Sequence, residues 1–179
     1  SNIGSQMTEA LAGLDRTAEL LEIERESDDE SRDIILGEIK GDLEFDNVSF
    51  AYEDGPEVVK GISFCAPAGS VTALVGSSGS GKTTIAGLTG SFLTPQGGKI
   101  TVDGKDLCKA TLESYRSQLG VVLQDDFLFD GTIEENILFG RPAAGEEALK
   151  EAVIAAHVQE FAAQFEDKLQ TVIGERGVK

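Results

Sequence analysis

The chain has 179 residues, of which 40% are hydrophobic and 26% charged; this suits one folded domain and excludes a chain that is disordered throughout. Its formal net charge is −17, and residues 1–57 alone hold 17 acidic side chains against 4 basic ones. Because nucleic acids and anionic bilayers are bound through clustered lysine and arginine, we expect no nucleic-acid partner and no general affinity for lipid surfaces.

The two cysteines, Cys65 and Cys108, lack metal-ligand spacing and predict reduced thiols in a cytosolic compartment. No apolar run approaches the roughly 20 residues that a membrane-spanning helix needs, so we expect this stretch itself to be soluble. The first methionine is Met7, which indicates a piece cut from a longer protein.

Residues 1–21 are predicted to form an amphipathic helix, because apolar side chains recur there at steps of three and four positions. These side chains are Ile3, Met7, Leu11, Leu14, Ala18 and Leu21. Residues 22–37 are rich in acids and serine and predict a solvated linker. The folded domain is then expected over residues 38–179.

Within this domain, short β-like runs alternate with helical stretches. The β-like runs are 43–50, 61–64, 71–75, 99–102 and 119–123. Helices are expected after Gly81, over 111–118 and, as one long helix, over 146–165. Strands that alternate with helices predict an α/β fold with a largely parallel sheet and crossover helices.

The clearest motif follows the apolar run 71–75 and matches G-x-x-x-x-G-K-[ST], the pattern of a phosphate-binding loop. Its residues are Gly76, Ser77, Ser78, Gly79, Ser80, Gly81, Lys82, Thr83 and Thr84. Glycines let the backbone amides point at phosphate, the next helix offers its positive end, and Lys82 counters the β and γ oxygens. Thr83 is expected to bind Mg²⁺, and Thr84 to reach the α-phosphate. The alternative is a chance glycine-serine turn, and the loop alone does not separate a kinase, a GTPase, a motor and a transporter subunit.

With the segments around this loop, the chain resembles the nucleotide-binding domain of an ABC transporter of the exporter type. Residues 45–52 and 58–64 resemble the family's aromatic loop, which implies that Tyr52 stacks on the adenine of ATP. Gln124 ends a predicted strand 42 positions after Lys82 and resembles the family's Q-loop, which implies a catalytic residue that contacts Mg²⁺ and the attacking water. The alternatives are a half-buried tyrosine at a strand end for Tyr52 and a surface glutamine for Gln124.

Two further segments resemble exporter segments that contact the transmembrane domain. Residues 127–140 resemble the exporter segment that lines the groove for coupling helices, which implies that Phe127 and Phe129 contact the transmembrane domain; burial in the core is the alternative. Residues 171–177 resemble the exporter X-loop, where Glu175 or Arg176 is expected to form charged contacts with the transmembrane helices.

The resemblance also implies a wider assembly. The helix over 1–21 resembles the tail of a preceding transmembrane helix that leads into the ATPase domain. A second ATPase domain is expected as a head-to-tail partner, at the cytoplasmic face of the plasma (inner) membrane.

Some motifs of the family do not occur in the sequence. The chain ends at Lys179, where the family's signature sequence is expected to start, and it has neither a later apolar run ending in Asp-Glu nor a switch histidine after it. His157 precedes those positions and is interpreted as a structural or surface histidine. This predicts the N-terminal part of an ABC ATPase domain, which binds ATP and Mg²⁺ but hydrolyses ATP poorly.

The sequence therefore predicts an incomplete α/β P-loop NTPase domain, with a largely parallel sheet, a small antiparallel β part and the start of a helical subdomain. Its expected function is ATP binding in an ABC exporter that couples ATP binding and hydrolysis to transport. A small-molecule kinase and an interaction module with a silent nucleotide site remain as alternatives.

Overall fold

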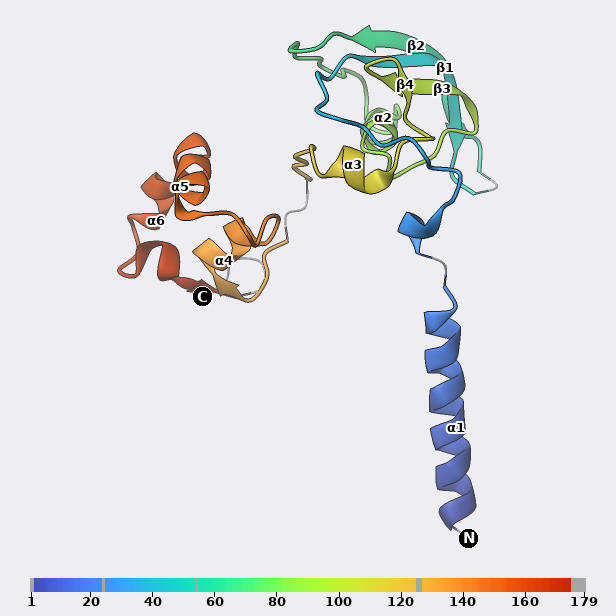
Figure 1. The fold of residues 1–179 in the computed structure, drawn as a ribbon, viewed down its shortest axis with the longest axis vertical. Coiled ribbons are helices and arrows are strands. Elements are labelled where there is room, and N and C mark those ends of the chain that lie inside the picture. The colour runs from blue at the N-terminus through green and yellow to red at the C-terminus, as the bar shows by residue number, and fades with distance from the viewer. Residues whose placement is uncertain (1, 24, 54, 125–126, 175–179) are drawn as a thin grey trace. The chain divides into compact units, whose positions relative to one another are not determined.

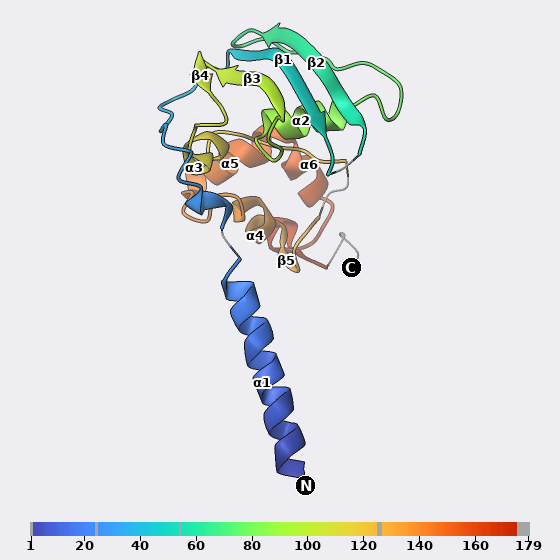
Figure 2. The same ribbon diagram turned by 90° about the vertical axis from the view of Figure 1, so that its right-hand side faces the viewer.

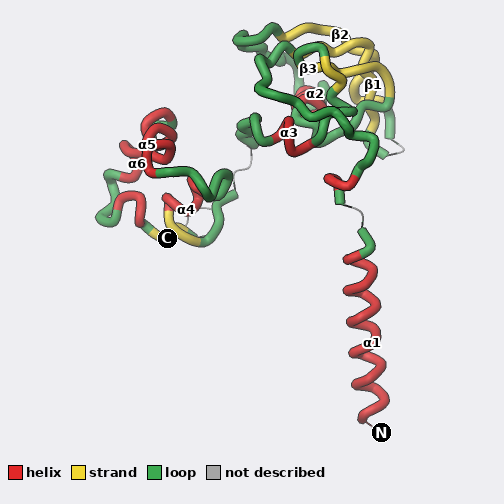
Figure 3. The backbone as a smooth tube through the Cα atoms, in the orientation of Figure 1, coloured by secondary structure: helices red, strands yellow, loops and turns green. Residues whose placement is uncertain are grey.

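The computed structural model describes residues 2–23, 25–53, 55–124 and 127–174, and its contacts divide the chain into two compact units, Ser1–Gly120 and Val121–Lys179. Figure 1 labels most of the helices and strands of both units, and Figure 3 distinguishes helices, strands and loops.

The helix expected over residues 1–21 is present as α1 (Asn2–Leu21). Its apolar side chains Met7, Leu11 and Leu14 are all exposed, with Leu14 at 65%. Among the helices in the described part of the chain, none combines the length and the apolar character needed to cross a membrane.

The segment after α1 is attached to the first unit, although its composition predicts a solvated linker. A short 3-10 helix, η1 (Glu26–Asp28), is exposed. Farther on, Ile34 forms a parallel β-bridge with Ala110, and Leu36 is only 5% exposed. We call residues 26–36 the anchoring segment. Burial of Leu36 contributes to its attachment, because the hydrophobic gain depends on the apolar area that is buried, and Arg32 donates to the carbonyl oxygens of Leu107 and Ala110 at 3.1 Å each.

The first unit contains an antiparallel sheet of four strands. Its strands are β1 (Leu43–Ala51), β2 (Glu57–Ala66), β3 (Gly97–Val102) and β4 (Lys105–Asp106), in the order β2-β1-β3-β4. Phe45, Val48 and Ile100 point from this sheet into the core and are at most 1% exposed. The predicted small antiparallel β part is thus present.

Two helices lie against this core. Helix α2 (Lys82–Thr89) lies below the sheet in Figure 2 and buries Leu88 completely. Helix α3 (Leu112–Arg116) buries Tyr115, whose hydroxyl donates to the carbonyl oxygen of Thr89 at 2.7 Å. The tyrosine therefore joins α3 to the last residue of α2.

The runs 71–75 and 119–123, predicted as strands of a parallel sheet, are irregular in the structure. Val71 is 99% exposed, Val75 93% and Val122 92%. A strand is stable only where neighbouring strands accept and donate its backbone hydrogen bonds. Neither run is paired within the described residues, so their β-branched composition alone does not make them strands.

The second unit contains a two-stranded antiparallel ribbon, β5 (Gly131–Thr132) with β6 (Val172–Ile173). Its helices are α4 (Ile133–Leu138), α5 (Glu146–Ala155), α6 (Val158–Ala162) and η2 (Lys168–Gln170). The prediction of a single helix over 146–165 is wrong. His157 separates α5 from α6 and has a left-handed φ of 56°. A residue in that conformation ends a right-handed helix.

Candidate functional site

The phosphate-binding loop of the first unit has the backbone that its glycines predict. Gly79 and Gly81 have φ of +77° and +87°, a region that side chains with a Cβ avoid. A Cβ added to Gly76 would lie 2.6 Å from the hydroxyl of Ser80. The amide of Ser80 donates to the carbonyl oxygen of Ser77 at 3.2 Å, which closes the turn.

Lys82 lies across this loop. Its Nζ donates to the carbonyl oxygens of Gly76 at 2.9 Å and of Ser77 at 2.7 Å, and lies 3.4 Å from the hydroxyl of Ser80. Lys82 is also the first residue of α2, where helix amides lack intrahelical acceptors and carry partial positive charge. The loop thus gathers an ammonium group and a helix N-terminus, which suits the charge of a polyphosphate.

The two threonines after Lys82 differ in exposure. Thr83 is exposed, whereas Thr84 is only 4% exposed. Mg²⁺ in nucleotide sites keeps several waters and binds through few protein ligands plus the phosphates, so an accessible hydroxyl at Thr83 fits this ion. The described residues hold no group of three or more His, Cys, Asp or Glu that could hold a metal by itself.

Tyr52 follows β1 and lies beside the phosphate-binding loop. Its hydroxyl is 3.1 Å from Thr84 Oγ1. Its ring is nearly perpendicular to that of Phe50, with ring centroids 4.9 Å apart and planes at 89°, and 49% of the residue is exposed. The structure therefore brings the predicted adenine-stacking residue and the predicted phosphate-binding residue into contact.

Gln124 and the aromatic residues after it belong to the second unit. Gln124 is exposed, and its role at the metal stays a prediction. Phe127 is 58% exposed and Phe129 43%, and Phe129 stacks on Phe139 with ring centroids 4.0 Å apart. Glu175 and Arg176 lie outside the described residues.

Two contacts, one in each unit, were not predicted from the sequence. One is the hydrogen bond between Tyr52 and Thr84. No sequence pattern indicates it, because the residues lie 32 positions apart. The other is the pair of hydrogen bonds between Asn136 and the backbone of Phe129. The Phe129 amide donates to Asn136 Oδ1 at 2.8 Å, and Asn136 Nδ2 donates to the Phe129 carbonyl oxygen at 2.9 Å. Asn136 is the one uncharged polar residue of α4, and this is the signal that could have suggested the contact.

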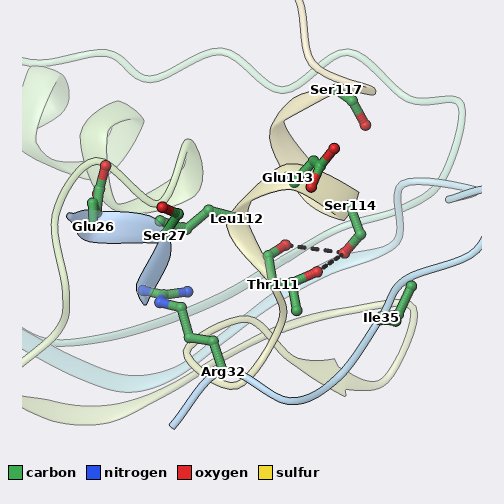
Figure 4. Close-up of a pocket in the computed structure, with 9 residues that line it drawn as sticks. All are labelled: Glu26, Ser27, Arg32, Ile35, Thr111, Leu112, Glu113, Ser114 and Ser117. Atoms are coloured by element: carbon green, nitrogen blue, oxygen red, sulfur yellow. Dashed lines mark hydrogen bonds between the residues drawn. The ribbon is translucent and has the colours of Figure 1, made fainter. Parts of the chain in front are cut away.

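A cavity of about 490 Å³ lies elsewhere in the first unit, between the anchoring segment and α3. Figure 4 shows the side chains that line it, among them Glu26, Arg32 and Glu113. None of its lining residues belongs to the phosphate-binding loop. The Ser114 hydroxyl is bonded to Thr111, at 2.7 Å to its Oγ1 and 3.0 Å to its carbonyl oxygen.

Comparison with known proteins gives a consistent result. A sequence model of the ABC transporter family matches residues 59–177. The chain is 42% identical to an uncharacterized ABC transporter ATP-binding protein, YwjA, of Bacillus subtilis (strain 168), over 94% of this chain and 29% of that protein. It is 40% identical to a putative multidrug export ATP-binding/permease protein, YgaD, of the same strain, over 99% of this chain and 31% of that protein.

Among solved structures, the chain is similar to a bacterial Atm1-family ABC exporter with ATP bound. The TM-score is 0.85 at 36% sequence identity, and the match covers 95% of this chain and 30% of the exporter chain. The α/β P-loop NTPase fold class is thereby confirmed. The chain spans less than a third of the length of the two curated relatives described above.

Proposed function

Because the chain belongs to the ABC transporter family, we propose that its residues 38–179 are the N-terminal part of the ATP-binding domain of an exporter. The observation that carries this proposal is the phosphate-binding loop, in which Lys82, the start of α2 and the Tyr52–Thr84 pair lie together. The intact protein couples ATP binding and hydrolysis to transport across a membrane.

The loop binds Mg·ATP through complementary charge. Lys82 and the amides at the start of α2 neutralise the β- and γ-phosphates, and Tyr52 stacks on adenine with the ring that is half exposed. The Thr83 hydroxyl holds Mg²⁺, which supplies positive charge against the phosphate oxygens. Stacking on a flat ring face selects weakly among bases, because it uses no hydrogen-bonding edge of the base.

Hydrolysis also needs a positioned water and an acceptor for its proton. Gln124 orients the water, but a glutamine amide does not titrate and so does not take up that proton. We therefore expect this stretch alone to bind Mg·ATP and to hydrolyse it slowly.

The partner surface proposed for the transmembrane domain is the aromatic cluster of Phe127, Phe129 and Phe139. All three are more than 40% exposed, although their rings contact one another. Exposed aromatic clusters of this kind are typical of protein interfaces. We propose that this cluster, with the region of Glu175, contacts the transmembrane domain at the cytoplasmic face of the membrane. α1 is then the tail of a preceding transmembrane helix, and a second ATPase domain binds head to tail.

Calorimetric titration of Mg·ATP into the wild-type chain and into Lys82→Ala tests the nucleotide site. Charged hydrogen bonds contribute about 1.5–3 kcal/mol, so Lys82→Ala should weaken binding roughly 10- to 100-fold. Lys109→Ala removes an exposed lysine outside the loop and should leave the affinity unchanged. Phosphate release is followed on the same samples.

Three results would contradict the proposal. Absence of binding by the wild-type chain would favour an interaction module with a silent nucleotide site. Transfer of phosphate to an added small-molecule acceptor would favour a kinase. Equal affinities of wild type and Lys82→Ala would place the nucleotide elsewhere.

A further inference from the structure

The contact between Tyr52 and Thr84 joins two parts of the first unit that are separate in the sequence. Thr84 lies in the first turn of α2 and is 4% exposed, and Tyr52 follows β1. Their hydroxyl oxygens are 3.1 Å apart, and either oxygen can be the donor. The contact by itself therefore does not fix the direction of this hydrogen bond.

A bound phosphate decides that direction. Each hydroxyl has one proton to donate and two lone pairs that accept. Phosphate oxygens accept, so Thr84 must direct its own proton to the phosphate when it binds one. Thr84 then accepts from Tyr52, because its single proton is already in use. The only arrangement that satisfies all three groups runs from Tyr52 to Thr84 to phosphate.

We propose that Tyr52 is a positioning residue for phosphate binding, acting through the hydroxyl of Thr84 in addition to its ring. This inference rests on the proposed nucleotide site. The hydroxyl of Tyr52 orients Thr84, and the near-perpendicular contact with the ring of Phe50 helps to hold the tyrosine ring in place. An ordered pair loses less conformational freedom when the ligand binds. The base and the phosphate are thus linked through one hydrogen bond.

A double-mutant cycle tests this link. Tyr52→Phe keeps the aromatic ring and removes only the hydroxyl, and Thr84→Val keeps the shape of a nearly buried side chain. A net hydrogen bond contributes about 0.5–1.5 kcal/mol, so Tyr52→Phe should weaken Mg·ATP binding roughly two- to tenfold. In the Thr84→Val background, Tyr52→Phe should change the affinity less than about twofold, because the relay is already absent.

Two controls separate the relay from a loss of folding. Tyr115→Phe removes the hydroxyl of the chain's other tyrosine, which contacts Thr89 and not the loop, and should leave the affinity for Mg·ATP unchanged. Thr84→Ser keeps a hydroxyl, and should keep the sensitivity to Tyr52→Phe. Thermal unfolding of each variant verifies that the sample is folded.

Mg·tripolyphosphate, which has no base, shows whether the hydroxyl acts on phosphate. The relay requires that Tyr52→Phe weaken binding of tripolyphosphate by a factor similar to that for ATP. The proposal is overturned if Tyr52→Phe binds both ligands like the wild type, or if the effects of Tyr52→Phe and Thr84→Val multiply. Either of these results overturns only the relay, and not the nucleotide site, provided that the wild-type chain binds Mg·ATP and Lys82→Ala weakens this binding. If the wild-type chain does not bind Mg·ATP, both the nucleotide site and the relay are overturned.

Discussion

Glu26 and Arg116 form a bidentate ion pair between residues that are 90 positions apart, with both N–O distances at 2.7 Å. The same guanidinium donates to the carbonyl oxygen of Ser91 at 2.6 Å and lies 4.8 Å from the centroid of the Phe92 ring. One side chain of α3 thus binds both the anchoring segment and the turn after α2.

Glu26→Gln should loosen the anchoring segment. Arg116 lowers the pKa of Glu26, mainly by hydrogen bonding to its carboxylate, so the pair is fully formed above the ordinary pKa of glutamate and is lost as the pH falls through the lowered value. Exposed pairs contribute about 0.2–1 kcal/mol. Hydrogen exchange at residues 31–36 should become faster in Glu26→Gln at neutral pH, and the difference from wild type should disappear in acid. Glu30→Gln, an exposed site nearby, is the control; equal exchange in all three proteins would contradict the prediction.

Tyr115→Phe should destabilise the first unit by about 0.5–1.5 kcal/mol, because it removes the hydrogen bond to Thr89 from a side chain that is 3% exposed. Burial raises the pKa of Tyr115, so the folded state retains the phenol proton that the unfolded chain releases near pH 10. The stability from this proton is therefore complete below the ordinary pKa of tyrosine and is lost as the pH rises from there through the raised value. Denaturant unfolding of wild type and Tyr115→Phe should show that their difference in the free energy of unfolding is smaller above pH 10 than at pH 7. An equal difference at both pH values would contradict a contribution from the retained phenol proton.

Asp103→Asn should make the first unit less stable at neutral pH. The backbone amides of Asp42, at 2.9 Å, and Lys40, at 2.7 Å, donate to the Asp103 carboxylate and lower its pKa. The stabilisation is complete above the ordinary pKa of aspartate and is lost as the pH falls through the lowered value.

Asparagine is the suitable replacement at position 103 because it tolerates the left-handed φ of 48° there. It retains one accepting oxygen and removes the charge. Thermal melts between pH 7 and pH 3 should show wild type losing its advantage over Asp103→Asn in acid. If Asp103→Asn melts at the same temperature as wild type at pH 7, the charge of Asp103 contributes nothing to the stability of the first unit.

Thr132→Ala should weaken the start of α4. The Thr132 hydroxyl accepts from the amide of Glu135 at 3.1 Å, while the Glu135 carboxylate accepts from the amide of Thr132 at 2.7 Å. Removing an N-cap side chain of this kind costs about 0.5–2 kcal/mol. Hydrogen exchange in residues 133–138 should therefore accelerate in Thr132→Ala and be restored in Thr132→Ser. Unchanged exchange in the alanine variant would mean that other contacts of the second unit hold α4.

The features that the sequence alone determined depend on neighbouring residues. The conformation of the phosphate-binding loop follows from glycines at 79 and 81, since few other residues adopt their positive φ. The helix over residues 1–21 was predicted from its three- and four-residue spacing and forms α1. The family resemblance rested on such local motifs, and the comparisons confirm it.

Distant contacts decided the rest. The run 71–75 has a strand composition, but it is irregular where no partner strand binds it in the described chain. The anchoring segment is acidic, yet Arg116 and the β-bridge at Ala110 attach it. Tyr52 meets Thr84 only because β1 and α2 pack in one unit. Composition and periodicity report what a residue tends to do locally, whereas hydrogen bonds and burial depend on which residues the fold brings to it.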